Sequence, residues 1–159
     1  MKNDKILARL DSMMTRIGSS LIGVNTENSD FDFATSISVW SKIRPILVDK
    51  LGFKENPKYD YYSSGCNKYS TNIMHNNFSV KMEYDGNQYD FIIYDDNHIA
   101  KVQEAVRKFK DFLDDVPNII PLLNDRVLRV EIFQHFLHHE FKTDHKTDEE
   151  LLDNIFAGM

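Results

Sequence analysis

The stretch GSSLIGVNTENSDFD, residues 18–32, combines a glycine–serine pair with two aspartates that are separated by one residue. Its end continues as Asp-Phe-Asp-Phe, in which carboxylate and apolar side chains alternate. Because successive side chains of a β-strand point to opposite faces, this alternation predicts a strand that carries Asp30 and Asp32 on one face. The segment before Gly18 predicts a short strand that ends at the glycine.

This pattern suits a metal ion and a phosphate group. Two aspartates on one strand face repel each other unless a cation lies between them. Mg²⁺ takes one or two carboxylates together with water and phosphate oxygens. Gly18 has no Cβ to block the approach of a phosphate, and the Ser19 hydroxyl and the N–H groups of a following helix can donate to phosphate oxygens. The stretch therefore predicts a phosphate cradle beside a metal site.

The stretch resembles the fingerprint of the DNA polymerase β-like nucleotidyltransferase superfamily. In that fingerprint a strand ends in Gly-Ser, a helix starts there, and the next strand carries Asp-x-Asp. The resemblance is close over residues 13–35 and extends to about residue 95 in architecture. The matching positions of this sequence are Gly18, Ser19, Gly23, Ser29, Asp30 and Asp32.

The resemblance implies an enzyme that transfers a nucleoside monophosphate, with AMP from ATP as the preferred expectation, to an acceptor hydroxyl and releases pyrophosphate. Two Mg²⁺ ions about 3.5–4 Å apart would clamp the attacking and leaving oxygens. Asp30 and Asp32 would bind metal and act in catalysis, and Gly18, Ser19 and Ser29 would bind the nucleotide. Family members modify antibiotics, tRNA ends or protein side chains, so the acceptor stays open among a small molecule, a protein hydroxyl and a tRNA end.

The family also uses a third carboxylate on a neighbouring strand, as a metal ligand and a catalytic group. Asp90 is the candidate, because it lies in the run Tyr89–Tyr94, where an acidic residue among apolar neighbours is out of place unless it faces a site. Asp95 and Asp96 are rivals at the end of that strand, where they resemble a helix cap. Glu83 on the partner strand is a weaker rival.

The rest of the sequence predicts an α+β fold, with a small mixed β-sheet flanked by helices and a helical C-terminal segment. We expect a single domain in which residues 1–96 form the catalytic core of nucleotidyltransferase fold and residues 97–159 form helices packed on it. The run FSVKMEYDGNQYDFIIY, residues 78–94, predicts a β-hairpin that turns at Asp85-Gly86.

Helices are predicted where apolar residues recur at intervals of three and four. Ser41 is the expected N-cap of the second helix, which places Pro45 in its first turn and Gly52 at its C-terminal cap. The cluster Asp95 to Asn97 is the expected cap of the third. The predicted helices cover about residues 6–14, 41–51, 98–116, 122–141 and 151–156.

Composition limits the classes of function. The chain of 159 residues has 19 basic and 25 acidic residues and a net charge of −6, which argues against binding extended duplex nucleic acid. A single cysteine, Cys66, excludes an internal disulfide and fits a reducing compartment. No apolar run reaches the roughly 18 residues of a membrane span, and no signal peptide is evident. We therefore expect a soluble, cytoplasmic protein.

Several other residues have both a functional and a structural interpretation. Histidines and an acid near the end of the last helix could form a metal site, but a solvated or capping face is preferred. Tyrosines of residues 59–69 could stack on a base, but suit a sheet as well. Basic residues could contact a triphosphate. These residues are His135, His138, His139 and Glu140; Tyr59, Tyr61, Tyr62 and Tyr69; and Lys42, Arg44 and Lys68.

Two further possibilities remain. If Asp90 is not the third carboxylate, the chain could be a catalytically inactive nucleotide- or protein-binding module that retains the fold. The C-terminal helices could also form a homo-oligomer interface or bind a protein partner, and the sequence does not decide between these roles and a pocket for the acceptor.

Overall fold

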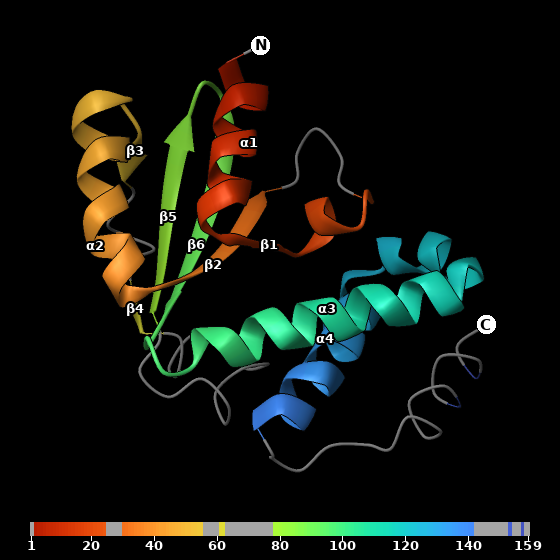
Figure 1. The fold of residues 1–159 in the computed structure, drawn as a ribbon. Coiled ribbons are helices and arrows are strands. Elements are labelled where there is room, and N and C mark those ends of the chain that lie inside the picture. The colour runs from red at the N-terminus through yellow and green to blue at the C-terminus, as the bar shows by residue number, and fades with distance from the viewer. Residues whose placement is uncertain are drawn as a thin grey trace.

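The computed structural model describes residues 2–24, 30–55, 61–62 and 78–141, together with Asp153 and Ala157. Its described part is α+β, as predicted, with a mixed sheet of six strands and helices packed on both faces (Figure 1). The strand order is β1-β2-β6-β5-β3, and β4 pairs with β5. The strands are β1 (Thr15–Ile17), β2 (Phe31–Ser36), β3 (Lys54–Glu55), β4 (Tyr61–Tyr62), β5 (Phe78–Tyr84) and β6 (Asn87–Tyr94).

The centre of the sheet is formed by β2, β6 and β5. β2 and β6 are parallel, and their register places Asp32 beside Asp90. β6 and β5 are antiparallel, and Lys81 lies opposite Asp90. The predicted hairpin turn is confirmed at Asp85 and Gly86, where φ is 49° and 79°. Positive φ at both central residues is the requirement of the tight turn that matches strand twist.

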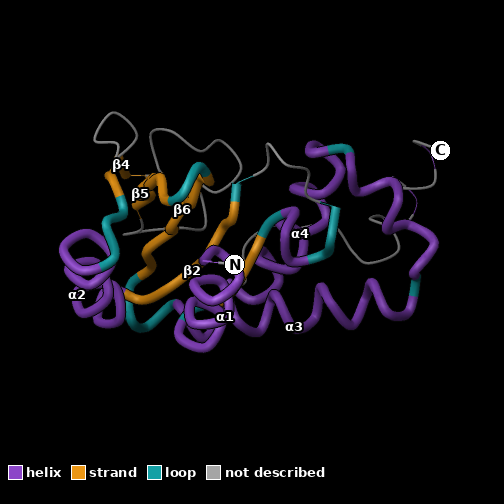
Figure 2. The backbone as a smooth tube through the Cα atoms, turned by 90° about the horizontal axis from the view of Figure 1, so that it is seen from above, coloured by secondary structure: helices purple, strands orange, loops and turns teal. Residues whose placement is uncertain are grey.

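One face of this sheet is mostly apolar. Helix α1 (Lys2–Met13) and helix α2 (Ile37–Pro45) cover it, as the view from above shows (Figure 2). Trp40 of α2 contacts the ring of Phe91 at a centroid distance of 5.0 Å. The phenylalanines that alternate with the aspartates thus anchor the strands, because burial of such a side chain contributes about 1.5–3 kcal/mol. Phe33, Tyr89 and Phe91 are fully buried.

The opposite face is shared between apolar and acidic residues. Helix α3 (Ile99–Asp115) and helix α4 (Arg126–Phe141) pack on its apolar part, where Ala34 and Tyr94 contact Val102 of α3 and Leu137 of α4. A second helical core forms between α3, α4 and the 3₁₀ segment η5 (Pro117–Asn124). The helices after residue 97 therefore lie on the same face of the sheet as the aspartates.

The start of α2 differs from the prediction. The helix begins at Ile37, directly after β2, and the hydroxyl of Ser36 caps it by accepting the Val39 N–H at 3.2 Å. The Ser41 hydroxyl instead donates to the Ile37 carbonyl at 2.8 Å, inside the helix. The expectation that Ser41 is the N-cap is therefore wrong, because the strand leads into the helix without a loop.

The end of α2 corrects the position of Pro45. This proline closes the α-helix instead of opening it, and the π-helical turn η2 (Ile46–Lys50) follows. Proline has no N–H to continue the regular ladder, so a change of hydrogen-bonding pattern at this point is expected. Gly52 has a φ of 85°, which confirms its predicted place at the left-handed C-terminal end.

The last helix also begins later than predicted. Residues 122–124 belong to η5, and α4 starts at Arg126. The Asp125 carboxylate accepts the Val127 N–H at 2.9 Å and so caps the helix. Among the described residues, no helix is both long enough and apolar enough to cross a membrane.

We predict that Ser36→Ala lowers the free energy of unfolding by about 1 kcal/mol, because it removes the cap of α2. In thermal unfolding this corresponds to a decrease in Tm of roughly 2–4 °C. Ser41→Ala is the matched control and should leave Tm unchanged or raise it slightly, since alanine is the better helix former. A larger loss in Ser41→Ala than in Ser36→Ala would contradict the assignment of the cap.

Candidate metal centre

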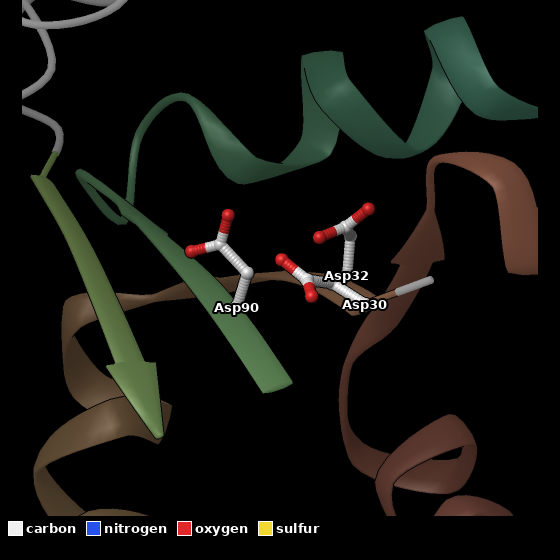
Figure 3. Close-up of side chains that lie close together, drawn as sticks. All are labelled: Asp30, Asp32 and Asp90. Carbon is white, nitrogen blue, oxygen red and sulfur yellow. The ribbon is translucent and has the colours of Figure 1, made fainter. Parts of the chain in front are cut away.

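Three carboxylates converge on one face of the sheet (Figure 3). Asp30 directly precedes β2, Asp32 lies within β2, and Asp90 lies in β6. One carboxylate oxygen from each of the three lies within 4.8 Å of the other two. The structure thus brings together the three aspartates that the sequence suggested, from segments about 60 residues apart in the chain.

The sheet explains why the side chains meet. Asp32 and Asp90 are register partners on parallel strands, and Asp30 is two residues before Asp32, so all three belong to the face opposite Phe33 and Phe91. In Figure 3 the three side chains point to the side of the sheet on which α3 lies. Burial of the apolar face holds the strands in place, and the register of β2 with β6 then sets the relative positions of the carboxylates.

Gly18 is packed against the cluster. Its φ of 74° and ψ of −160° belong to a region that is essentially restricted to glycine. A Cβ at this position would lie 2.3 Å from Oδ2 of Asp32, far inside van der Waals contact. The sequence suggested that Gly18 leaves room for a phosphate, and the structure shows that it leaves room for a carboxylate.

Lys81 is the residue of this site that the sequence reasoning missed. Its Nζ lies 3.3 Å from Oδ2 of Asp30 and 3.3 Å from Oδ2 of Asp90. It reaches them from β5, where it is the register partner of Asp90. The available signal was the hairpin itself, since the turn at residues 85–86 sets Lys81 opposite Asp90 on the same face.

Burial raises the pKa values of two acids of the cluster, Asp32 and Asp90. Burial raises the pKa of Asp32 to about 8, with the neighbouring charges of Asp90 and Asp30 adding to the effect. Burial also raises the pKa of Asp90, although the Lys81 ammonium opposes the shift. Burial would lower the pKa of Lys81, but the carboxylates of Asp90 and Asp30 outweigh it and raise that pKa above its usual value.

The donor set fits a hard divalent cation. All three side chains offer carboxylate oxygens, which Mg²⁺ prefers. Oδ1 of Asp90 is buried and has no hydrogen-bond partner among the described residues. A buried carboxylate oxygen without a partner is costly, and a bound cation would satisfy it. Asp30, Asp32 and Asp90 are the residues that would hold the ion.

Two arginines of α4 add positive charge near the cluster. Arg129 acts on Asp32 and Arg126 acts on Asp90 through longer-range attraction, which partly offsets the rise of both acids' pKa values. The guanidinium of Arg129 also donates to the Leu123 carbonyl at 2.9 Å, which orients it from the end of η5. Sequence reasoning missed both arginines, because no local pattern shows that α4 lies near the strands.

The predicted phosphate cradle is only partly described. The helix expected after Gly18 is a single 3₁₀ turn, η1 (Ser19–Leu21), because the Leu21 N–H donates to the Gly18 carbonyl at a spacing of three residues. The expectation of a regular helix N-terminus at Ser19 is therefore wrong. Ser19 itself is buried. Ser29 lies outside the described residues.

The rival acids have other roles. Asp96 accepts hydrogen bonds from the backbone N–H of Ser38, at 3.0 Å, and from its hydroxyl, so it ties the start of α3 to the first turn of α2. Asp95 accepts the Asn97 N–H at 2.9 Å in the turn before α3, whose N-cap is His98. Glu83 is exposed near the hairpin turn. The structure places none of the three with Asp30 and Asp32.

The other singled-out residues lie away from the carboxylates or are not described. Lys42 and Arg44 belong to α2, on the opposite face, and Arg44 forms an ion pair with Glu55. His135 is buried and contacts the ring of Phe136, so the expectation of a solvated or capping face is wrong for this histidine, whereas His139 is exposed and lies with His138 in the last turn of α4. Several of these residues lie outside the described part of the chain, namely Tyr59, Cys66, Lys68 and Tyr69. The same holds for the side chains of Tyr61 and Tyr62 and for most of the predicted helix at 151–156.

No protein-family model matches the chain, and neither a curated protein nor a solved structure matches it. The resemblance of residues 18–32 to the nucleotidyltransferase fingerprint therefore stays a prediction. Its functional meaning depends on the geometry described above.

We predict that Gly18→Ala displaces the Asp32 carboxylate and weakens Mn²⁺ binding at least tenfold, as measured by titration calorimetry. It should also lower the free energy of unfolding by about 1–3 kcal/mol, because alanine is strained at this backbone conformation. Gly23→Ala is the control, since Gly23 has a φ of 76° but no atom within 4 Å of the position of its Cβ. Equal losses of Mn²⁺ affinity in both variants would contradict a specific role for Gly18.

We predict that Asp32→Asn stabilises the metal-free protein at pH 8, by about 1–2 kcal/mol. The folded-state pKa of Asp32 is near 8 and its ordinary value is 3.8. The contribution of Asp32 to the free energy of unfolding is therefore fully present below pH 4 and is lost as the pH rises to 8. The Asn variant lacks this loss, so its advantage in Tm should grow between pH 5 and pH 8. Mg²⁺ should raise the Tm of the wild-type protein and not of the variant. A variant that is less stable than the wild type at pH 8 would contradict the raised pKa of Asp32.

Proposed function

We propose that this protein is a Mg²⁺-dependent nucleotidyltransferase that transfers a nucleoside monophosphate, AMP from ATP first among the candidates, to an acceptor hydroxyl. The observation that carries the proposal is the convergence of Asp30, Asp32 and Asp90 on one sheet face, with Gly18 packed directly against Asp32. Gly18, Asp30 and Asp32 belong to the pattern that resembles the superfamily fingerprint, and Asp90 is the candidate for the third carboxylate that the family uses.

The arrangement of strands supports the proposal independently of that fingerprint. Asp90 was proposed as the third carboxylate on its apolar surroundings in the sequence, and the parallel pairing of β2 with β6 puts it beside Asp32. Acidic side chains without a shared function are not expected to cluster in this way, since like charges that lie opposite each other destabilise a sheet. Three acids gathered against their repulsion favour a function that requires negative charge at one point.

The proposed reaction is a displacement at the α-phosphorus of the nucleotide. The acceptor oxygen forms a bond to that phosphorus, the bond from phosphorus to the bridging oxygen of the β-phosphate breaks, and pyrophosphate leaves with the electron pair. Mg²⁺, when bound, would neutralise charge on the phosphates and favour ionisation of the attacking hydroxyl. Asp90 would help to hold the metal ion through Oδ1, the buried oxygen without a described partner, and the hydroxyl proton would leave to water.

Positive side chains would bind the triphosphate next to the acids. A nucleoside triphosphate brings about four negative charges, which the carboxylates alone would repel. Lys81 lies within the cluster, and Arg126 and Arg129 act on it from α4. Arginine is suited to phosphate because its planar donors can form paired hydrogen bonds. We therefore assign the side of the site next to α4 to the phosphates.

An inactive binding module with the same fold is the second candidate. In such a module the lysine between Asp30 and Asp90 would replace the metal ion and close the site. The two candidates differ in a direct observable, since only the enzyme converts ATP to pyrophosphate and a labelled product. The acceptor classes to be compared are a small molecule, a protein hydroxyl and a tRNA end.

We predict transfer of label from α-labelled ATP in the presence of Mg²⁺ and one of three acceptors: an aminoglycoside, deacylated tRNA or a protein with exposed hydroxyls. Asp30→Asn, Asp32→Asn and Asp90→Asn should each reduce the rate at least 100-fold, because each removes charge that the transition state requires. Pyrophosphate release provides the second readout.

Glu83→Gln is the matched control for these variants, since Glu83 is an exposed acid near the same hairpin, and its activity should equal that of the wild type. The rate should also disappear when Mg²⁺ is removed with a chelator and return when it is added back. Unimpaired ATP binding without transfer or pyrophosphate release would refute the proposed enzymatic function and support the inactive binding module.

A further inference from the structure

Lys81 is placed where a cation would bridge two of the three carboxylates. Its Nζ is equidistant, at 3.3 Å, from one oxygen of Asp30 and one oxygen of Asp90. The side chain is only 25% exposed, and its backbone position is fixed by pairing with Asp90 in the central hairpin. The ammonium group is therefore part of the cluster rather than a surface charge that happens to point toward it.

The ion pairs of Lys81 leave part of the cluster for a metal ion. They use Oδ2 of Asp30 and Oδ2 of Asp90. Oδ1 of Asp90 and both oxygens of Asp32 are not used by the lysine in these two contacts, and Asp32 lies on the side of the cluster next to Gly18. A divalent ion can thus bind at Asp32 with an oxygen from each neighbour while Lys81 stays in place.

The charge balance favours one divalent ion over two. When a metal ion is bound and all three carboxylates are ionised, they carry three negative charges, and the lysine neutralises one of them. One divalent ion then brings the cluster to neutrality, whereas two would leave two uncompensated positive charges within a few ångströms. A buried cluster with uncompensated charge is unfavourable, so the second ion would bind weakly.

We propose that Lys81 is the second cation of this centre, so that the protein alone binds one divalent metal ion where the two-ion arrangement of the resemblance would need two. The inference rests on the proposed metal-dependent function and specifies its metal stoichiometry. Lys81 acts as a positioning residue: it holds Asp30 and Asp90 together in the metal-free protein and keeps a positive charge beside the phosphates.

Mn²⁺ titration of the intact protein tests the proposal without any need for turnover. Calorimetry together with electron paramagnetic resonance should show one Mn²⁺ per wild-type chain, with the spectrum of an isolated ion. Lys81→Met, which keeps an unbranched side chain, one atom shorter, but removes the charge, should bind two Mn²⁺ and show the magnetic coupling of ions that lie close together. Lys81→Arg keeps the charge and should bind one.

The results separate the two proposals. Two coupled Mn²⁺ ions on the wild-type protein would overturn the role of Lys81 and leave the metal centre intact. A stoichiometry of one in a folded Lys81→Met variant would overturn it as well. Absence of Mn²⁺ binding to the wild type, with the same absence in Asp32→Asn, would refute the metal centre itself. The wild-type spectrum decides the matter even if Lys81→Met does not fold, because it reports directly whether one or two ions are bound.

Discussion

Electrostatic repulsion among three aspartates is the constraint on which the site depends. With one oxygen of each carboxylate within 4.8 Å of the others, each ionised pair repels by on the order of 3 kcal/mol or more at an effective dielectric constant of 20. The fold opposes this cost with apolar packing on the other side of the same strands, where Phe33 and Phe91 are fully buried. The burial of apolar side chains on one face of the strands therefore offsets the electrostatic repulsion of the carboxylates on the other face.

The same repulsion explains the roles of the residues around the cluster. Gly18 lacks a side chain where Asp32 needs space, and Lys81 supplies a positive charge where Asp30 and Asp90 need one. Both residues reduce the cost of assembling the carboxylates without removing their charge. Under the proposed function, this arrangement would prepare the site for a cation before the cation arrives, which is the property that metal-assisted chemistry requires.

The sequence was most informative where the chemistry is local. Alternation of aspartate and phenylalanine gave the strand β2 and the face of its carboxylates, and Asp85-Gly86 gave the hairpin, because both patterns depend on residues within a few positions of each other. Asp90 was identified because an acid among apolar strand residues contradicts its surroundings. The α+β class and the mixed sheet followed from these elements.

Features that depend on tertiary contacts were missed or misplaced. Lys81 could have been assigned to the site from the hairpin register, whereas the approach of Arg126 and Arg129 depends on how α4 packs on the sheet. Ser41 and Ser36 are both acceptable caps by composition, and only the direct passage of β2 into α2 selects Ser36. His135 was expected on a solvated or capping face because it lies near the C-terminal end of its helix, but the structure buries it.

The central claim is that the carboxylates of Asp30, Asp32 and Asp90 bind a divalent cation that contacts a nucleotide. A crystal structure with Mn²⁺ and a nonhydrolysable ATP analogue measures this directly through the anomalous signal of manganese. The account predicts a peak within coordination distance of all three carboxylates and of a phosphate oxygen, with Lys81 still beside Asp30 and Asp90. A nucleotide bound elsewhere, or a manganese peak from which Asp90 is separated by more than one water molecule, would contradict it.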